Sequence, residues 1–534
     1  MPRTRKQPSP THALTLRPVT THCPECRYRL WADYANYRTV TTLDAVTRLT
    51  LEVRRCPNAA CSRFHMPFRP EAEPHFVLPH HEFGLDVLSL VGRLRHHEHR
   101  SVPEIHRDLA ARGVVAAERT VTNLLDRYDE LKALSVADPK RLRPLLRRQR
   151  RVMLAIDGLQ PDVGHEVLWV LRDCLSGEIL LARSLLSAKA ADLSVLLDDV
   201  RRALPVPVTG VVSDGQGSIR KAVARSLPGV PHQLCHFHYL REAARPISEA
   251  DRHAKKELKK RVRGVRQIER TAEEDDDAEA EIVRGYCAAV RAALTDDGLP
   301  PLAAAGLKLH DRLAKIAASL DGVSARAKEL PAGLRKLAAL VHRGLDETAA
   351  LWPPVRAAFR WVKRVARILK NEAKRSARRV RRRLSGVLSR IRRAAAEAPE
   401  VSARSQLRHF AKVTKSYWPG LFACHDSRDI PRTNNDLEHL FGSHRYHERR
   451  SSGRRRASPG LVVRGSVRVV SGVATRLHPG AGLKLPDFLE NWRKSRVDLE
   501  SRRETRRQQG RFRKDPDGYL NTLENKCFQL GLPS

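Results

Sequence analysis

The 534-residue chain contains no apolar run close to the about 18 residues that a membrane-spanning helix needs, so we expect no membrane segment. Residues 1–18 include basic side chains but not the apolar core of a signal peptide, so nothing there marks the chain for secretion. We therefore expect a reducing cytoplasmic compartment, in which the nine cysteines need a role other than disulfides. A Walker-type loop, a dinucleotide fingerprint and a Ser-His-Asp constellation are also missing, which gives no ground for those enzyme classes.

Acidic residues are scarce relative to basic ones. The chain has 60 Asp and Glu against 99 Lys and Arg, a formal net charge of +39. Such an excess costs self-repulsion unless a polyanion neutralises it in use. The 41% hydrophobic content is sufficient for folded domains, and the length predicts three or more of them. These numbers favour a nucleic-acid-binding protein associated with the nucleoid.

Four of the nine cysteines lie in the first 61 residues and form two closely spaced pairs. The pairs are Cys23 with Cys26, and Cys56 with Cys61. A short gap lets one turn of backbone offer two thiolates to one ion, and two such pairs can complete a tetrahedral zinc site. Residues between the pairs alternate as strands do, so we predict a zinc ribbon with structural Zn²⁺ over residues 1–75. Unligated cysteines are the alternative, and His22 or His65 could replace one ligand.

Two helices separated by a turn are predicted between residues 80 and 140. Ser101-Val-Pro-Glu104 has the form of a capping box, Gly113 offers a turn, and a second helix follows from about Glu118. A short helix, a glycine turn and a second helix favour a helix-turn-helix whose second helix enters the major groove of DNA. The polar residues predicted to contact DNA there are Arg119, Thr120, Thr122 and Asn123. An ordinary helical hairpin is the alternative.

From residue 151 the pattern changes to strands alternating with helices. We expect strands at 152–156, 167–171, 179–186, 208–212 and 233–235, and helices at 188–203 and 217–226. This order predicts a mixed α/β sheet covered by helices. Two of the strands are predicted to end in an Asp followed by Gly, at Asp157 and Asp214. If these strands are neighbours, their carboxylates converge on a site for divalent cations, although Asp-Gly is also a common turn signal.

Four sequence features together resemble the DDE transposases of bacterial insertion sequences. They are Asp157, Asp214, Cys235-His-Phe-His238 and Thr433-Asn-Asn-Asp-Leu-Glu438. The resemblance is to the branch akin to Mutator-type elements, which has a C/D-x-x-H motif after the second Asp. It covers about residues 150–245 and 410–460 directly. It implies an RNase H-like catalytic core, interrupted by a large α-helical insertion and preceded by the zinc ribbon and the helix-turn-helix.

The resemblance also implies the chemistry and the residues that perform it. Asp157, Asp214 and Glu438 would hold two Mg²⁺ (or Mn²⁺) ions, and His238 would lie near the scissile phosphate. A DNA strand would be cut by water, and the freed 3′-hydroxyl would then attack target DNA without a covalent enzyme intermediate. Among local alternatives to the third acid, Asp436 ranks second.

The third acid is expected on a helix. Thr433 can cap this helix, and Arg445, seven residues after Glu438, can contact a phosphate from the same face. Cys235 and His238 are three residues apart, with two further histidines nearby, but the sequence offers no second ligand pair to complete a metal site. We therefore expect Cys235 to be a small buried side chain.

The remaining segments are assigned by composition and by the resemblance. Residues 150–245 and 411–460 are the two parts of the core, 246–410 the helical insertion and 461–534 a basic C-terminal segment. Residues 374–393 carry ten basic and no acidic side chains, which favours phosphate contacts. Trp418 could stack on an extruded base, although core packing is the stronger expectation. A basic loop after the Glu helix, predicted to contact phosphate, contains Arg454, Arg455 and Arg456.

The function predicted from these features is a DNA transposase that binds the ends of its element and cuts and joins DNA. Its partners would be element ends and target DNA, and bringing two ends together implies a dimer or larger assembly. Two alternatives remain. One is a DNA-binding regulator or domesticated descendant that has lost catalysis, and the other is an RNase H-like nuclease that cuts without joining.

Overall fold

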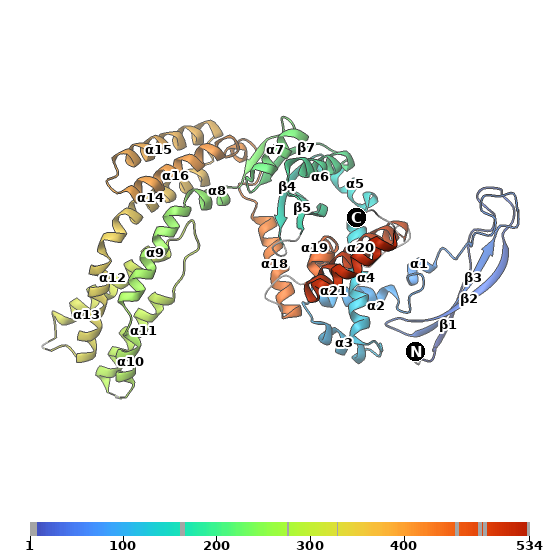
Figure 1. Cartoon of the computed structure of the whole chain (residues 1–534), viewed down its shortest axis with the longest axis horizontal. Helices are drawn as coiled ribbons and strands as arrows, with labels where there is room; N and C mark the ends of the chain where they lie inside the picture. The colour runs from blue at the N-terminus through green and yellow to red at the C-terminus, as the bar shows by residue number, and fades with distance from the viewer. Residues whose placement is uncertain are drawn as a thin grey trace. The chain divides into compact units, whose positions relative to one another are not determined.

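The computed structural model describes residues 8–160, 166–274, 277–327, 329–453, 459–478, 483 and 489–530. The chain divides into two compact units, which are coloured by residue number in Figure 1. The first comprises Met1–Val208 and Asn435–Ser534, and the second comprises Thr209–Asn434. The second unit is therefore an insertion within the sequence of the first.

A three-stranded sheet begins the first unit. Its strands β1 (His12–Leu16), β2 (Trp31–Thr41) and β3 (Val46–Arg55) have the order β1-β3-β2. Strands β2 and β3 form an antiparallel hairpin, and β1 pairs with β3 in parallel. Buried and more exposed residues alternate along β3, as expected for a sheet with one covered face. The strands predicted between the cysteine pairs are thereby confirmed.

A group of helices follows the short helix α1 (Glu73–Phe76). They are α2 (Leu85–His96), α3 (Val102–Ala111), α4 (Glu118–Val136) and α5 (Pro139–Gln149). The capping box at the start of α3 is confirmed, because Ser101 and Glu104 each accept a hydrogen bond from the backbone amide of the other. Gly113 has φ +77° between α3 and α4, so its turn conformation favours glycine. At Gly92 a Cβ atom would lie 2.2 Å from the Tyr128 ring, because α2 and α4 pack closely there.

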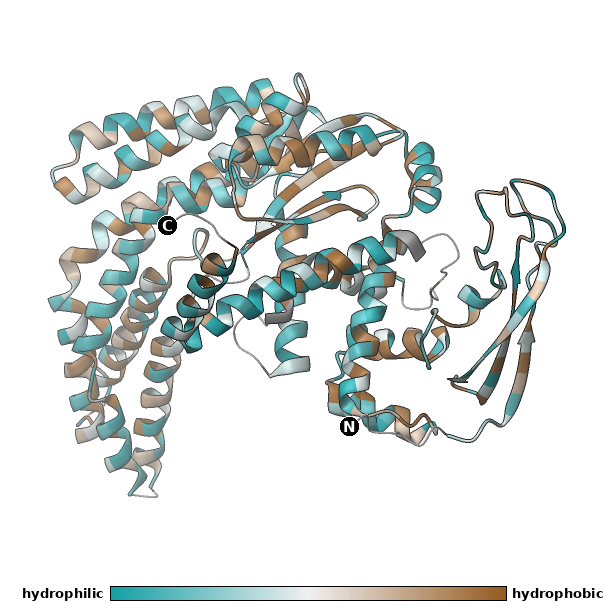
Figure 2. Cartoon of the chain, turned by 45° about the vertical axis from the view of Figure 1, so that its right-hand side comes forward, coloured by the Kyte–Doolittle hydropathy of each residue, from teal (hydrophilic) through white to brown (hydrophobic). Residues whose placement is uncertain are grey.

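The mixed α/β sheet predicted from residue 151 onward is also confirmed. Its elements are β4 (Val152–Leu159), β5 (Val167–Asp173), β6 (Ile179–Leu185), α6 (Ala190–Ala203), β7 (Val208–Ser213), α7 (Gly217–Ser226) and β8 (His232–Leu234). The strand order is β6-β5-β4-β7-β8, and the division between the two units follows the first residue of β7. Strands β4, β5 and β6 are antiparallel, whereas β7 and β8 are parallel. Figure 2 shows hydrophobic residues concentrated along these strands.

The last helices of the first unit are α18 (Asn435–Ser452), α19 (Pro459–Leu477), α20 (Leu489–Lys514) and α21 (Pro516–Gln529). Helix α18 packs against β4, and α19 packs against α2, α4 and β6. Arg464 on α19, itself buried, forms ion pairs with the partly buried Asp126 and the buried Glu130 of α4. The segment over 461–534 was predicted only as basic, and α19 within it also contributes apolar side chains to the core.

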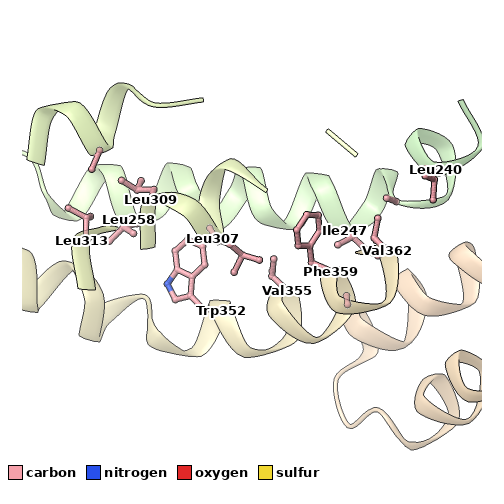
Figure 3. Close-up of a cluster of buried hydrophobic side chains, with 14 of the residues drawn as sticks. Leu240, Ile247, Leu258, Leu307, Leu309, Leu313, Trp352, Val355, Phe359 and Val362 are labelled. Carbon is pink, nitrogen blue, oxygen red and sulfur yellow. The ribbon is translucent and has the colours of Figure 1, made fainter. Parts of the chain in front are cut away.

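The second unit is mainly helical after β8. Its helices are α8 (His236–Ala243), α9 (Arg245–Arg261), α10 (Val265–Glu273), α11 (Ala278–Thr295), α12 (Ala305–Ser324), α13 (Ala332–Glu347), η1 (Ala349–Leu351), α14 (Trp352–Lys370), α15 (Ala377–Glu397), α16 (Val401–Tyr417), η2 (Trp418–Gly420) and α17 (Ala423–Asp426). Helices α9, α12 and α14 contribute side chains such as Leu258, Leu313 and Phe359 to one continuous core (Figure 3). The helical character predicted for residues 246–410 is confirmed. Across the described residues, no helix has the length and apolar character needed to span a membrane.

Candidate metal centre and catalytic residues

The four N-terminal cysteines meet at one point in the first unit. The Sγ atoms are 3.8 Å apart for Cys23 and Cys61 and 3.4 Å apart for Cys26 and Cys56, and all four lie within 4.8 Å of one another. A tetrahedral zinc ion with Zn–S bonds of about 2.3 Å separates its sulfur ligands by about 3.8 Å. All four are free thiols rather than disulfides. This donor set therefore fits a structural metal such as zinc, as predicted.

A tight backbone turn carries the first pair of thiols, Cys23 and Cys26. The backbone amide of Cys23 donates a hydrogen bond to the carbonyl oxygen of Tyr28, and Arg27 between them has φ +63°. The neighbouring histidines face other groups: the ring Nδ1 of His22 lies 3.0 Å from Thr21 Oγ1, and that of His65 lies 3.1 Å from Arg55 Nη1. The four-cysteine set is thus complete without a histidine.

The thiols of this cluster differ in acidity. A hydrogen bond from the backbone of Tyr28 lowers the pKa of Cys26 to about 7. Burial raises the pKa of Cys56 to about 12, because a desolvated thiolate is unfavourable. A bound divalent cation would supply the positive charge that lets all four sulfurs act as thiolates.

Asp157 and Glu438 both belong to the first unit. Asp157 lies inside β4 opposite Val170, and its Oδ1 accepts a hydrogen bond from the backbone amide of Gly158 at 2.8 Å. The prediction that the strand ends at Asp157 is wrong, because pairing with β5 continues to Leu159. Glu438 is half-buried in the first turn of α18, the helix that packs against β4.

The two candidate acids on the first turn of α18 differ in their exposure to solvent. The helix begins at Asn435, so Asn434 rather than Thr433 immediately precedes it, and the predicted Thr433 cap is wrong. Asn is itself among the side chains preferred at a cap position. Asp436 is exposed, whereas Glu438 is half-buried about 200° around the helix, at 3.6 residues per turn. Arg445, further along α18, is exposed.

Asp214 and His238 belong to the second unit. Asp214 follows β7 directly, as predicted, and its Oδ1 accepts a hydrogen bond from the amide of Gln216 at 2.8 Å. Gly215 has φ +90°, and a Cβ there would lie 2.6 Å from the Tyr417 ring, so both conformation and space require glycine. His238 is half-buried in the first turn of α8.

The residue Cys235 is fully buried immediately before α8. The backbone amide of Asn434 donates to its Sγ at 3.3 Å. The expectation that Cys235 is a small buried side chain is therefore confirmed, and the strand predicted to include it ends one residue earlier, at Leu234.

The residues predicted to contact DNA have different environments. On the first turns of α4, Arg119, Thr122 and Asn123 are exposed and Thr120 is half-exposed, so this face of the helix is accessible. Trp418 packs on Phe422, with ring centroids 5.0 Å apart in an edge-to-face arrangement, and lies against the core of the second unit. Core packing, the stronger of the two expectations, therefore describes it.

The helix α18 extends to Ser452, just before the predicted basic loop. Ser451 and Ser452 still belong to α18, and Gly453 has φ +68°. The arginines of this loop lie outside the described residues. They are Arg454, Arg455 and Arg456.

An exposed row of arginines lies on α15. Among the described residues no acidic side chain pairs with Arg378, Arg379, Arg382 or Arg383. By contrast, Arg266 and Arg291 on α10 and α11 both form ion pairs with Glu269. The charge of these four arginines is therefore not neutralised by an ion pair among the described residues.

Comparison with models of known protein families and with curated proteins finds no match to this chain.

Proposed function

We propose that the chain is a DDE-type transposase that binds the ends of an insertion sequence and cuts and joins DNA with two divalent metal ions. Support comes from the order of the acidic residues along the fold. An Asp stands in β4, a second Asp follows β7, and a Glu stands on the first turn of α18, the helix that packs against β4. This order, on a mixed sheet interrupted by a helical insertion, carries the proposal.

The donor set suits hard divalent cations. Carboxylate oxygens from Asp157, Asp214 and Glu438 are the ligands that Mg²⁺ and Mn²⁺ prefer. When bound, such ions supply Lewis-acid stabilisation of the attacking and leaving oxygens of a phosphodiester. His238, on the first turn of α8, would contact the scissile phosphate, and Arg445 would hold a neighbouring phosphate.

The other parts of the chain would bind DNA. The four-cysteine domain and the exposed face of α4 would recognise the element ends, since Arg, Thr and Asn side chains there can reach base edges. The uncompensated arginines of α15 would hold phosphates without reading sequence. Because transposition requires two ends at once, the active form would be a dimer or larger assembly on DNA.

The proposal is tested by Asp157→Asn on a labelled duplex made from inverted repeats that bracket the gene. The wild-type chain should nick this duplex in Mg²⁺. Asp157→Asn should lose at least a hundredfold in nicking rate while its Kd for the duplex stays within twofold, because the change removes charge at the metals and leaves the reading face intact. Asp192→Asn, the same chemical change on α6, is the matched control and should cut normally.

Three other results would contradict the proposal. End binding by the wild-type chain without nicking, in Mg²⁺ or Mn²⁺, would indicate a DNA-binding regulator. Products that only shorten, with no insertion into a plasmid target, would indicate a nuclease. Equal loss of binding and nicking in Asp157→Asn would show that Asp157 has a structural role.

A further inference from the structure

Three metal-ligating side chains from distant parts of the sequence meet in the second unit. His236 is the first residue of α8, and Cys424 and His425 lie on α17. One ligand atom of each residue lies within 4.8 Å of the others. The Sγ of Cys424 is 3.9 Å from Nε2 of His236, and the two imidazole centroids are 5.8 Å apart.

We propose that His236, Cys424 and His425 form a second metal site in this chain, which binds zinc or a similar borderline-soft divalent ion. In tetrahedral zinc coordination, bonds of about 2.0 Å to nitrogen and 2.3 Å to sulfur place these two ligand atoms about 3.5 Å apart. The observed separation between Cys424 and His236 needs only a small adjustment to reach this value. Three protein ligands leave the fourth position for water.

The protonation states of the imidazoles favour a cation. Burial lowers the pKa of His236 to about 4 and also lowers the pKa of His425, so both rings are neutral at neutral pH and each has a lone pair to donate. Burial raises the pKa of the Cys424 thiol to about 12, so metal binding would release its proton. The exposed Arg432 opposes a cation here, but solvent screens its charge.

Hydrogen bonding leaves one ring nitrogen available. The Nε2 atom of His425 is buried and has no hydrogen-bond partner among the described residues, which costs free energy that a metal–nitrogen bond would offset. On the other side of the ring, Nδ1 is 3.4 Å from the Asn371 amide, a contact at the long limit for a hydrogen bond. The Nε2 of His236 lies 2.8 Å from the carbonyl oxygen of Leu421, so metal binding through Nε2 would replace that hydrogen bond.

The site lies on the segment that leads to the Glu438 helix. This segment is already held by the start of α8: the amide of His236 donates to the carbonyl of Arg432 at 3.0 Å. The amide of Cys424 donates to Gln233 Oε1 at 2.9 Å. A metal bound by α8 and α17 would fix the same segment more firmly. The role of this metal in positioning Glu438 for cutting rests on the proposed function. The binding of the metal itself does not depend on that function.

The metal content of the purified full-length chain tests this site. The chain is expressed with zinc, dialysed and analysed by mass spectrometry for zinc per protein. We expect two zinc ions per chain, one ion in Cys424→Ser, one in Cys23→Ser/Cys26→Ser and none when the three changes are combined. Cys527→Ser, at an exposed cysteine outside both clusters, is the matched control and should keep two.

A spectroscopic measurement covers the case in which a variant folds poorly. Co²⁺ added to Cys23→Ser/Cys26→Ser should give a thiolate-to-cobalt charge-transfer band, and His425→Gln should weaken it while circular dichroism stays unchanged. One zinc per wild-type chain, or a cobalt band that Cys424→Ser leaves intact, would overturn the site. Two zinc ions per chain in a protein that does not cut DNA would support the site and contradict the proposed function alone.

Discussion

At the scale of single residues, the exposure of side chains on the first turn of α18 distinguishes two candidate ligands. Asp436 and Glu438 are two positions apart, which turns them to opposite sides of the helix. Only Glu438 is partly buried. A carboxylate shielded from water interacts more strongly with a bound cation, which makes Glu438 the better candidate ligand. Sequence spacing alone could not separate these two acids.

We expect Glu438→Gln to reduce nicking of an end duplex by at least a hundredfold, because it removes a charged metal ligand and keeps the size of the side chain. Asp436→Asn, the equivalent change on the exposed side of the same helix, should retain cutting within about threefold. Gel-based single-turnover nicking rates in Mg²⁺ measure both. The reverse ranking would identify Asp436 as the third acid.

At the scale of secondary structure elements, charge is paired in some helices and left unpaired in others. Lys255, Arg261, Arg266 and Arg291 each form ion pairs within the second unit. At least one partner of each pair is exposed to solvent, so such pairs add little stability, but they neutralise the charge of the basic residues locally. Among the described residues, Arg378, Arg379, Arg382 and Arg383 of α15 have no such ion-pair partners, so their charge is not neutralised locally.

Two variants with the same loss of charge show whether DNA binding depends on the arginines of α15 or on the total charge of the chain. Changing Arg378, Arg379, Arg382 and Arg383 to Gln should reduce the steepness of log Kd against log salt by up to about 3.6, about 0.9 for each lost phosphate contact. The same four-charge reduction at the paired residues Lys255, Arg261, Arg266 and Arg291 should change the slope by less than about 1. Fluorescence anisotropy with a duplex of arbitrary sequence measures the slope. Equal effects would show that net charge, rather than α15, determines binding.

Buried charge has a different role on α4. Asp126 and Glu130 pair with Arg464, and the indole nitrogen of Trp492 donates to Glu130 at 2.8 Å. Removing one partner of a buried pair leaves an uncompensated charge and typically costs about 3–5 kcal/mol. These contacts hold the C-terminal helices against the helix whose first turns are predicted to contact DNA.

At the scale of the whole molecule, the net charge of +39 and the need to hold two DNA ends lead to a prediction about assembly. A polyanion that neutralises several chains removes the repulsion between them. We therefore expect the 60.3 kDa chain to form a complex with two or more copies and two end duplexes. Mass photometry at physiological salt measures the number of chains in the complex. The Asp157→Asn variant should assemble as the wild type does. Complexes that contain one copy at every concentration would contradict the proposed synapsis.

Local signals made much of the fold predictable. The Ser101 capping box, the Gly113 turn and the apolar strand runs act over a few residues, so they could be read without knowing the tertiary contacts. Errors arose where pairing with a neighbour extended an element. Strand β4 runs past Asp157 because β5 continues to pair with it. The burial of α19 follows from its apolar side chains, which pack against the helices of the first unit.

The two groups of metal-ligating side chains show the same division between sequence and tertiary structure. The sequence by itself determined the four-cysteine site, because short gaps place two thiols on one turn and the pairs lie within one small domain. It also determined the excess positive charge and the sheet-forming segments. Only the tertiary structure brought His236 to Cys424, which is 188 residues away, and left the Nε2 atom of His425 buried without a partner. Such a meeting depends on how α8 and α17 pack, and packing between distant segments leaves no periodic signal in the sequence.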